Sequence, residues 1–213
     1  MAALSPARAG TVTFDFATLT ASGTTLCTSS CVLPTLGTHD FTLSGATVAA
    51  TAYSTATSTS VSGTAYLTQK PTAAGTGETG LGESDTYPGS SDPQYEIMPG
   101  KAVVLDNTQA IAKGYTPESI TIGSIQYANG ENANVYAGST QPGSPGTLLA
   151  NVTGTSSSVV QTVALAKGDT FVTVEGVTGN VVLMSEAFLV PEPASLAVLG
   201  VGLLGLVAAR RRR

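Results

Sequence analysis

Four carboxylates lie within one short stretch of the chain, and of all residues in the sequence they are the best candidates for catalysis or ion binding. They are Glu83, Asp85, Asp92 and Glu96. Paired carboxylates hydrolyse glycosidic bonds, and about six to eight oxygen ligands hold a calcium ion. A glycosidase cleft usually offers aromatic platforms, but the sequence contains no tryptophan. We therefore place calcium binding ahead of glycoside hydrolysis, and a merely solvated acidic loop ahead of both.

Nucleophilic catalysis has little support in this sequence. A serine nucleophile needs an imidazole beside it, and His39 is the only histidine. It stands just ahead of a predicted strand, so we interpret it as a solvent-facing loop residue. The chain has no Gly-x-Ser-x-Gly pattern and no nucleotide-binding glycine pattern. The sequence predicts a protein without catalysis of its own and without a required cofactor.

The tyrosines suggest an alternative function. Most of the seven fall inside predicted strands, where an aromatic ring packs against its neighbours. Tyr87 and Tyr95 lie instead beside the acidic residues, where a ring could stack on a sugar. The alternative is therefore a secreted carbohydrate-binding module, with or without help from calcium.

Composition narrows the class of protein. Only 11% of the 213 residues are charged, and small polar residues dominate, which is typical of an extracellular β-rich domain. Residues 10–190 carry four lysines against thirteen acids, a net charge of −9. Nucleic-acid binding needs a basic face, so we exclude nucleic acid as a partner.

The elements that must position these residues are short strands. Polar and apolar residues alternate in many segments, which are rich in Val, Thr, Ile, Tyr and Phe. Turn residues separate them, and no helical runs intervene. Residues 72–94 are dense in Gly, Ser, Thr and Pro, and predict a long surface loop. We expect one all-β domain over 10–189, a β-sandwich of jelly-roll-like type. The expected strands are 11–16, 41–52, 63–69, 101–106, 119–127, 133–136, 159–165, 170–175 and 181–189.

The end of the chain has three parts in order: the triplet Pro191-Glu192-Pro193, an apolar run at 194–209, and the cluster Arg210, Arg211, Arg212 and Arg213. Sixteen helical residues span about 24 Å, which is short for a bilayer core of about 30 Å. Arginines flanking such a segment stay in the cytoplasm. We expect a single C-terminal transmembrane helix, with the rest of the chain outside.

This three-part tail, residues 190–213, resembles the PEP-CTERM sorting domain. The resemblance implies a membrane-embedded exosortase as partner, cleavage near the Pro-Glu-Pro motif, and an association with exopolysaccharide and biofilm. It also implies an exported protein that passes through the inner membrane and reaches the cell surface or the extracellular space. The stretch Gly80-Leu81-Gly82-Glu83 resembles the Gly-Leu-Gly-Val element in the body of many such proteins, although Glu83 replaces the valine.

Export has two further consequences. Residues 1–9 end in Ala7-Arg8-Ala9, a pattern with small residues where a signal peptidase needs them, so we interpret them as the remnant of a signal peptide that begins upstream. Cys27 and Cys31 are the only cysteines. In an oxidising compartment they predict a local disulfide bond.

Overall fold

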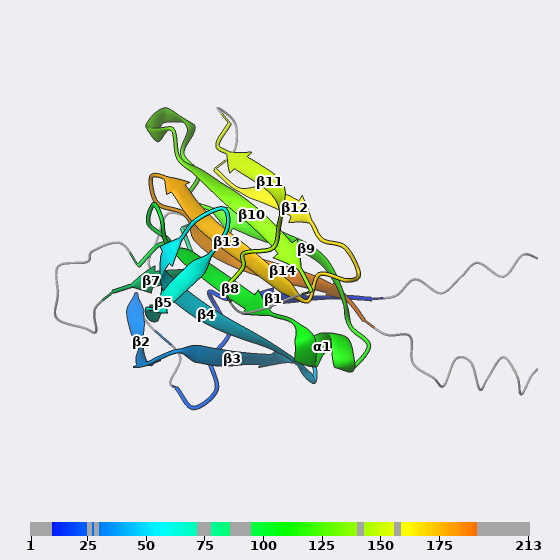
Figure 1. The fold of residues 1–213 in the computed structure, drawn as a ribbon. Helices are drawn as coiled ribbons and strands as arrows, with labels where there is room; N and C mark the ends of the chain where they lie inside the picture. Colours follow the sequence, from blue (N-terminus) through cyan, green and yellow to red (C-terminus); the bar gives the residue numbers. More distant parts are fainter. Residues whose placement is uncertain are drawn as a thin grey trace, which may run out of the picture.

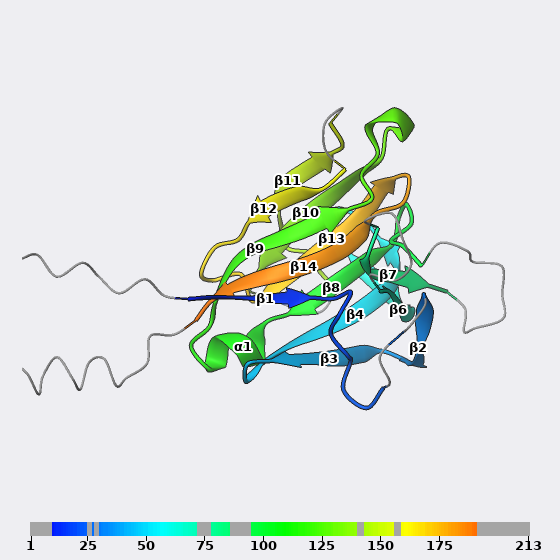
Figure 2. The same cartoon turned by 180° about the vertical axis from the view of Figure 1, so that it is seen from behind.

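The fold consists of two antiparallel sheets that pack against each other. The structure is a computed structural model, and it describes residues 10–24, 27, 30–71, 78–85, 95–139, 143–155 and 159–190. Figures 1 and 2 show the two layers from opposite sides. The described residues include one short α-helix, α1 (Thr108–Ala112), and a 3₁₀ turn, η2 (Tyr127–Asn129). The predicted all-β class is confirmed.

Each sheet has seven strands. Six of them follow one another in a continuous order, and the seventh pairs with one strand of that series. In the first sheet the order is β12 (Gln161–Ala164), β9 (Thr116–Gly123), β14 (Val182–Leu189), β7 (Gly80–Ser84), β6 (Tyr66–Lys70) and β2 (Cys31–Leu36), and β1 (Thr11–Asp15) pairs with β14. In the second sheet it is β11 (Thr147–Thr153), β10 (Asn132–Gly138), β13 (Phe171–Thr178), β8 (Ala102–Asp106), β4 (Ala46–Ala56) and β3 (Thr38–Leu43), and β5 (Val61–Thr64) pairs with β4.

The core lies between the two sheets. Alternate residues of a strand point to opposite faces, so a strand that borders this layer contributes about every second residue to it. The Phe14 and Phe188 rings of the first sheet meet edge to face at 5.5 Å, and Phe16 meets Phe41 of β3 at 5.3 Å. All four rings are fully buried, and burying one such ring stabilises the fold by about 1.5–3 kcal/mol.

Several expected segments differ from the structure. The expected strand 41–52 is a hairpin of β3 and β4, because Ser44 and Gly45 both have positive φ angles (52° and 83°) that reverse the chain. The run at 63–69 is divided between β5 and β6, and strands β2 and β11 were not expected.

The prediction of one long surface loop over 72–94 is wrong for residues 80–84. These residues form β7, a buried strand inside the first sheet. The local composition conceals this strand because it lacks the usual β-branched residues. The tertiary packing explains the glycine at position 82: a Cβ there would meet the backbone of Tyr95 and Glu96.

The two ends of the described chain meet at one end of the sandwich. Thr11 pairs with Leu189, and the Val190 amide donates a hydrogen bond to the Gly10 carbonyl at 2.8 Å. In Figure 1 the start of β1 (blue) and the end of β14 (orange) lie on the right of the domain, near α1. The opposite end is formed by loops between strands, and it carries the cavity described below.

Candidate functional site: a polar cavity at the loop end

A cavity of about 490 Å³ opens at the end of the sandwich that lies away from the chain ends. Asn180, in the turn before β14, contributes to its wall, whereas the far end of β14 adjoins Val190. Several loops and strand ends of both sheets build it. Its lining residues are Ser30, Lys70, Glu78, Tyr95, Glu96, Ser124, Gln126, Asn129, Glu131 and Asn180.

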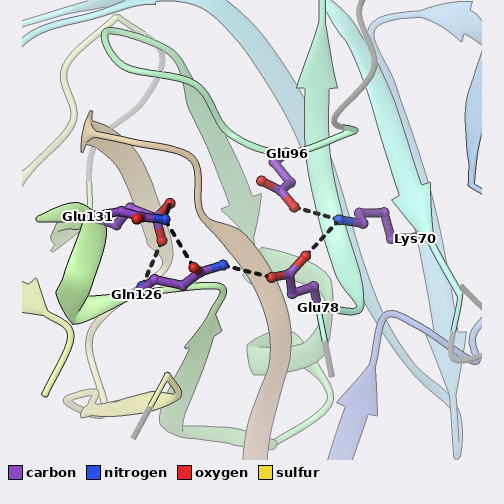
Figure 3. A network of polar contacts seen from close by, with 6 residues as sticks. Lys70, Glu78, Glu96, Gln126 and Glu131 are labelled. Carbon is purple, nitrogen blue, oxygen red and sulfur yellow. Dashed lines mark hydrogen bonds and ion pairs between the residues drawn. The ribbon is translucent and has the colours of Figure 1, made fainter. Parts of the chain in front are cut away.

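Lys70 organises one side of the cavity. Its Nζ lies 2.5 Å from Glu96 Oε1 and 3.5 Å from Glu78 Oε2. Figure 3 shows the ammonium group held between the two carboxylates. Lys70 is the last residue of β6, and Glu78 stands two residues before β7. The β6–β7 pairing therefore fixes Lys70 and the backbone next to Glu78, while Glu96 reaches Lys70 from a separate segment.

Amide groups extend the network across the cavity. Gln126 donates from Nε2 to Glu78 Oε1 at 3.0 Å, and its backbone amide donates to Glu131 Oε2 at 2.6 Å. Asn129 donates to Gln126 Oε1 at 3.0 Å. A continuous chain of polar contacts thus runs from Glu96 through Lys70, Glu78 and Gln126 to Glu131, as seen in Figure 3. Such a network holds side chains in fixed positions without help from a ligand.

The charge of the cavity is negative. Three glutamates line it against one lysine. Burial raises the pKa of Glu96; the hydrogen bond and charge of Lys70 oppose this shift, while the charges of Glu78 and Glu131 add to it. The two other carboxylates are therefore close enough to repel a negative charge on Glu96.

Two lining residues have strained backbone. Tyr95 and Ser124 have φ angles of 52° and 58°, and Ser44 is the one other non-glycine with positive φ in the described part of the chain. A hairpin turn explains Ser44, but no hairpin turn accounts for the other two. Non-glycine residues in this region cost about 1–3 kcal/mol each and tend to gather at functional sites.

Ser124 has a second unusual property. The residue is only 2% exposed and it lines the cavity. No hydrogen bond joins its hydroxyl to another described residue, yet the oxygen is not among the fully buried side-chain atoms that lack a partner. The hydroxyl is therefore open to the cavity that the residue lines.

The carboxylates singled out in the sequence do not gather at one point. Glu96 lines the cavity, whereas Glu83 is buried in β7, where it pairs in register with Leu67, and Asp85 forms an ion pair with Lys101. Asp92 lies outside the described residues. Among the residues that the structure describes, no group of three or more His, Cys, Asp or Glu could hold a metal ion.

Sequence reasoning found part of the cavity and missed the rest. Tyr95 and Glu96 belong to it, and Tyr87 lies outside the described residues. Glu78, Gln126 and Glu131 were missed because they come from separate segments with no shared local pattern. The positive φ angles and the cavity are tertiary properties, so no signal in the sequence pointed to them.

His39 takes no part in this site. The expectation of a solvent-facing loop residue is wrong, since His39 lies in β3 and is 5% exposed. Its Nε2 lies 3.0 Å from the Thr35 carbonyl oxygen, which gives the ring a structural partner. The β3–β4 pairing places the residue opposite Ala50 and so draws it into the sheet.

Cys27 and Cys31 are joined by a disulfide bond, with Cα atoms 6.0 Å apart. The bond closes a small loop just before β2, next to Ser30 of the cavity wall. A bond across so short a loop removes little entropy from the unfolded chain, so its main effect is local.

Two more buried carboxylates lie outside the cavity. Glu186 of β14 is fully buried, and Asn107 Nδ2 donates to its Oε1 at 2.6 Å. Burial raises the pKa of Glu186 to about 8, although the Asn107 hydrogen bond opposes the shift. Glu175 of β13 accepts a hydrogen bond from the Tyr136 hydroxyl at 2.7 Å. Burial and this hydrogen bond raise the pKa of Tyr136 to about 12.

Comparison with known proteins identifies the tail and not the domain. Residues 189–213 match the family model of the PEP-CTERM protein-sorting motif, so this is a protein with a PEP-CTERM domain. The motif supports exosortase-dependent sorting of an exported protein that passes through the membrane to the cell surface. No curated protein and no solved structure matches the chain.

The triplet Pro191-Glu192-Pro193 lies outside the described residues, as do the expected signal-peptide remnant at 1–9, the apolar segment 194–209 and the four terminal arginines. Within the part of the chain that the structure describes, no helix is long and apolar enough to cross a membrane. The expected transmembrane helix therefore stays a prediction.

Proposed function

We propose that this chain is a non-catalytic protein of the cell surface or extracellular matrix, associated with exopolysaccharide and biofilm. The PEP-CTERM motif at residues 189–213 carries the proposal. The segment 194–209 holds the chain in the inner membrane as an intermediate, with Arg210–Arg213 on the cytoplasmic side. Exosortase then cleaves near Pro191–Pro193 and frees the domain for attachment or release.

The geometry of the domain supports this use. Strand β14 begins beside the cavity and ends at Leu189, next to the sorting motif. Eight strand residues span about 26 Å. A domain held through its C-terminal end would therefore present the cavity away from its point of attachment, toward the surrounding matrix.

The processing step is tested by mass spectrometry of protein recovered from the surface of a host that contains an exosortase. We expect a C-terminus near Pro191–Pro193, and we expect the combined Pro191→Ala, Glu192→Ala and Pro193→Ala variant to retain Arg213. Pro145→Ala, which changes a proline in the loop before β11, is the control and should be processed normally. A wild-type protein that keeps Arg213 in this host would contradict the proposal.

The alternative function, a secreted carbohydrate-binding module, is favoured by the polar cavity. Carboxylates, amides, a serine hydroxyl and Tyr95 line it together, and these groups hydrogen-bond and stack on sugars. Binding without release of reducing ends is the expected result with oligosaccharides, and turnover would refute the non-catalytic assignment.

Calcium assistance at the acidic segment of Glu83, Asp85, Asp92 and Glu96 belongs to this alternative. If a calcium ion binds the folded chain there, it raises the midpoint of thermal unfolding by mass action, and EDTA reverses the shift. An unchanged midpoint in millimolar calcium would remove the ion from the proposal.

We also propose that the sandwich has jelly-roll-like connectivity. Successive strands often pass from one sheet to the other: β8 to β9, β9 to β10, β11 to β12, β12 to β13 and β13 to β14 change layers. Such crossing between two antiparallel sheets is how a double-sheet jelly roll is built. An experimental structure with strands in a different order would overturn this assignment.

A further inference from the structure

The geometry points to a particular ligand for the cavity: we propose that it binds an amine-bearing, positively charged saccharide. The inference rests on the carbohydrate-binding alternative above and adds the charge of the sugar. Three observations carry it, namely the unbalanced charge of the wall, the spacing of its carboxylates and the unpaired hydroxyl of Ser124.

The wall carries one lysine against three glutamates. Lys70 is its only cation and is shared by Glu78 and Glu96, so Glu131 has no cationic partner among the described residues. The contacts of Glu131 are hydrogen bonds from neutral groups, the Gln126 amide at 2.6 Å and Asn129 Nδ2 at 3.4 Å. A buried carboxylate without a cation is costly, and a ligand ammonium group would offset that cost. A uronic acid would be repelled by the same charges.

The carboxylates are too dispersed for a bare metal ion. In the described part of the chain no three acidic, histidine or cysteine side chains come close enough to share one. Glutamates on opposite sides of a 490 Å³ cavity instead suit a larger ligand with charges and hydroxyl groups spread over its surface. The volume falls in the usual range of small-ligand sites, about 300–1,000 Å³.

Ser124 and Tyr95 supply what a sugar ring needs besides charge. Ser124 is 2% exposed and lines the cavity, and its hydroxyl, which has no hydrogen bond to a described residue, is available for a ligand hydroxyl. Tyr95 lines the cavity next to Glu96, and aromatic rings are groups on which the C–H face of a sugar can lie. Both residues have positive φ, so the fold holds them in the wall at a cost in free energy.

The test is calorimetric titration of the full chain, kept in detergent, with three oligosaccharides of equal length: a glucosamine oligomer, its N-acetylated counterpart and an oligogalacturonate. We expect the glucosamine oligomer to bind at least about tenfold more tightly than the N-acetylated one and the uronate not to bind. Affinity should also fall with added salt, because screening weakens charge attraction.

Glu131→Gln is the diagnostic variant, since it removes a charge yet keeps an oxygen to accept the Gln126 amide. We expect a loss of about fivefold or more for the glucosamine oligomer and little change for the N-acetylated one. Glu118→Gln is the matched control, because Glu118 is an exposed glutamate near the start of β9, at the end of that strand away from Ser124. Melting curves of both variants check that they fold.

The outcomes distinguish sugar binding as such from the selection of a positively charged sugar. Equal or tighter binding of the N-acetylated oligomer would leave a carbohydrate-binding module and overturn selection by charge. Tighter binding of the uronate would overturn it too. If none of the three oligosaccharides binds, both the inference and the carbohydrate-binding alternative fail, while the sorting of the protein is unaffected.

Discussion

Two buried glutamates of this domain have opposite environments. One belongs to the wall of the candidate site and the other to the hydrophobic core. Glu96 lies in the wall of the cavity, 2.5 Å from the Lys70 ammonium group. Glu186 lies between the sheets, where it is paired in register with Phe14 and Ile120, two core residues. Its one hydrogen bond comes from a neutral amide, that of Asn107.

Burial raises the pKa of both groups, but only one of them has a counter-ion. For Glu96 the lysine opposes the cost of burial, so a charged group can persist at a surface that a ligand can reach. For Glu186 no cation is present among its described neighbours, and burial raises its pKa to about 8. A buried carboxylate thus indicates function here only where it also lines an opening that a ligand can reach.

Replacing the core glutamate should give the largest effect. The pKa of Glu186 is about 8 in the folded protein and its ordinary value is 4.5, so between these two values the folded state binds the extra proton. The free energy of unfolding therefore falls as pH rises from about 4.5 to about 8, by at most about 1.4 kcal/mol per pH unit. Glu186→Gln, which cannot titrate, should flatten this dependence.

Urea unfolding measured from pH 5 to pH 8 checks the point, with Glu118→Gln as the control for loss of one negative charge. We expect the control to keep the wild-type slope. If Glu186→Gln also keeps that slope, the core carboxyl is ionised at neutral pH and the contrast with Glu96 disappears.

Removing the counter-ion should give an intermediate effect. Lys70→Met leaves Glu78 and Glu96 without their shared cation in a partly buried place, and we expect a loss of about 2 kcal/mol at pH 7. The loss should shrink at low pH as the carboxyls take up protons. Lys101→Met is the matched control: its partner Asp85 is 50% exposed, and exposed pairs contribute about 0–1 kcal/mol. Equal losses in the two variants, compared by thermal unfolding, would argue against a special role for Lys70.

Relieving backbone strain should give the smallest change in stability. Ser124→Gly and Ser44→Gly both place glycine at a positive φ, and each should stabilise the fold by about 1 kcal/mol. Only Ser124→Gly removes a hydroxyl from the cavity wall, so only this variant should lose sugar binding. The pair is compared by melting temperature and calorimetric titration. Loss of binding in Ser44→Gly as well would show that the assay reports stability and not the site.

The sequence alone was sufficient for the tail and for the fold class. The tail is a linear signal: Pro191-Glu192-Pro193, an apolar run and four arginines are adjacent in the chain, so the motif is present before any folding. The β class followed from alternation in segments such as 11–16, because period-2 patterning is also local. Strands without that pattern, such as β7, escaped prediction because glycines there serve contacts with distant backbone.

The cavity was decided by tertiary structure. Lys70, Glu96 and Glu131 are separated by 26 to 61 positions, and they meet only because loops from both sheets converge at one end of the sandwich. The sequence pointed to carboxylates that are neighbours in the chain. In the structure, however, Glu96 pairs with Lys70 and Asp85 with Lys101, and Glu83 lies in β7 opposite Leu67. Closeness along the chain therefore does not gather these side chains, whereas the meeting of segments that are distant in sequence does.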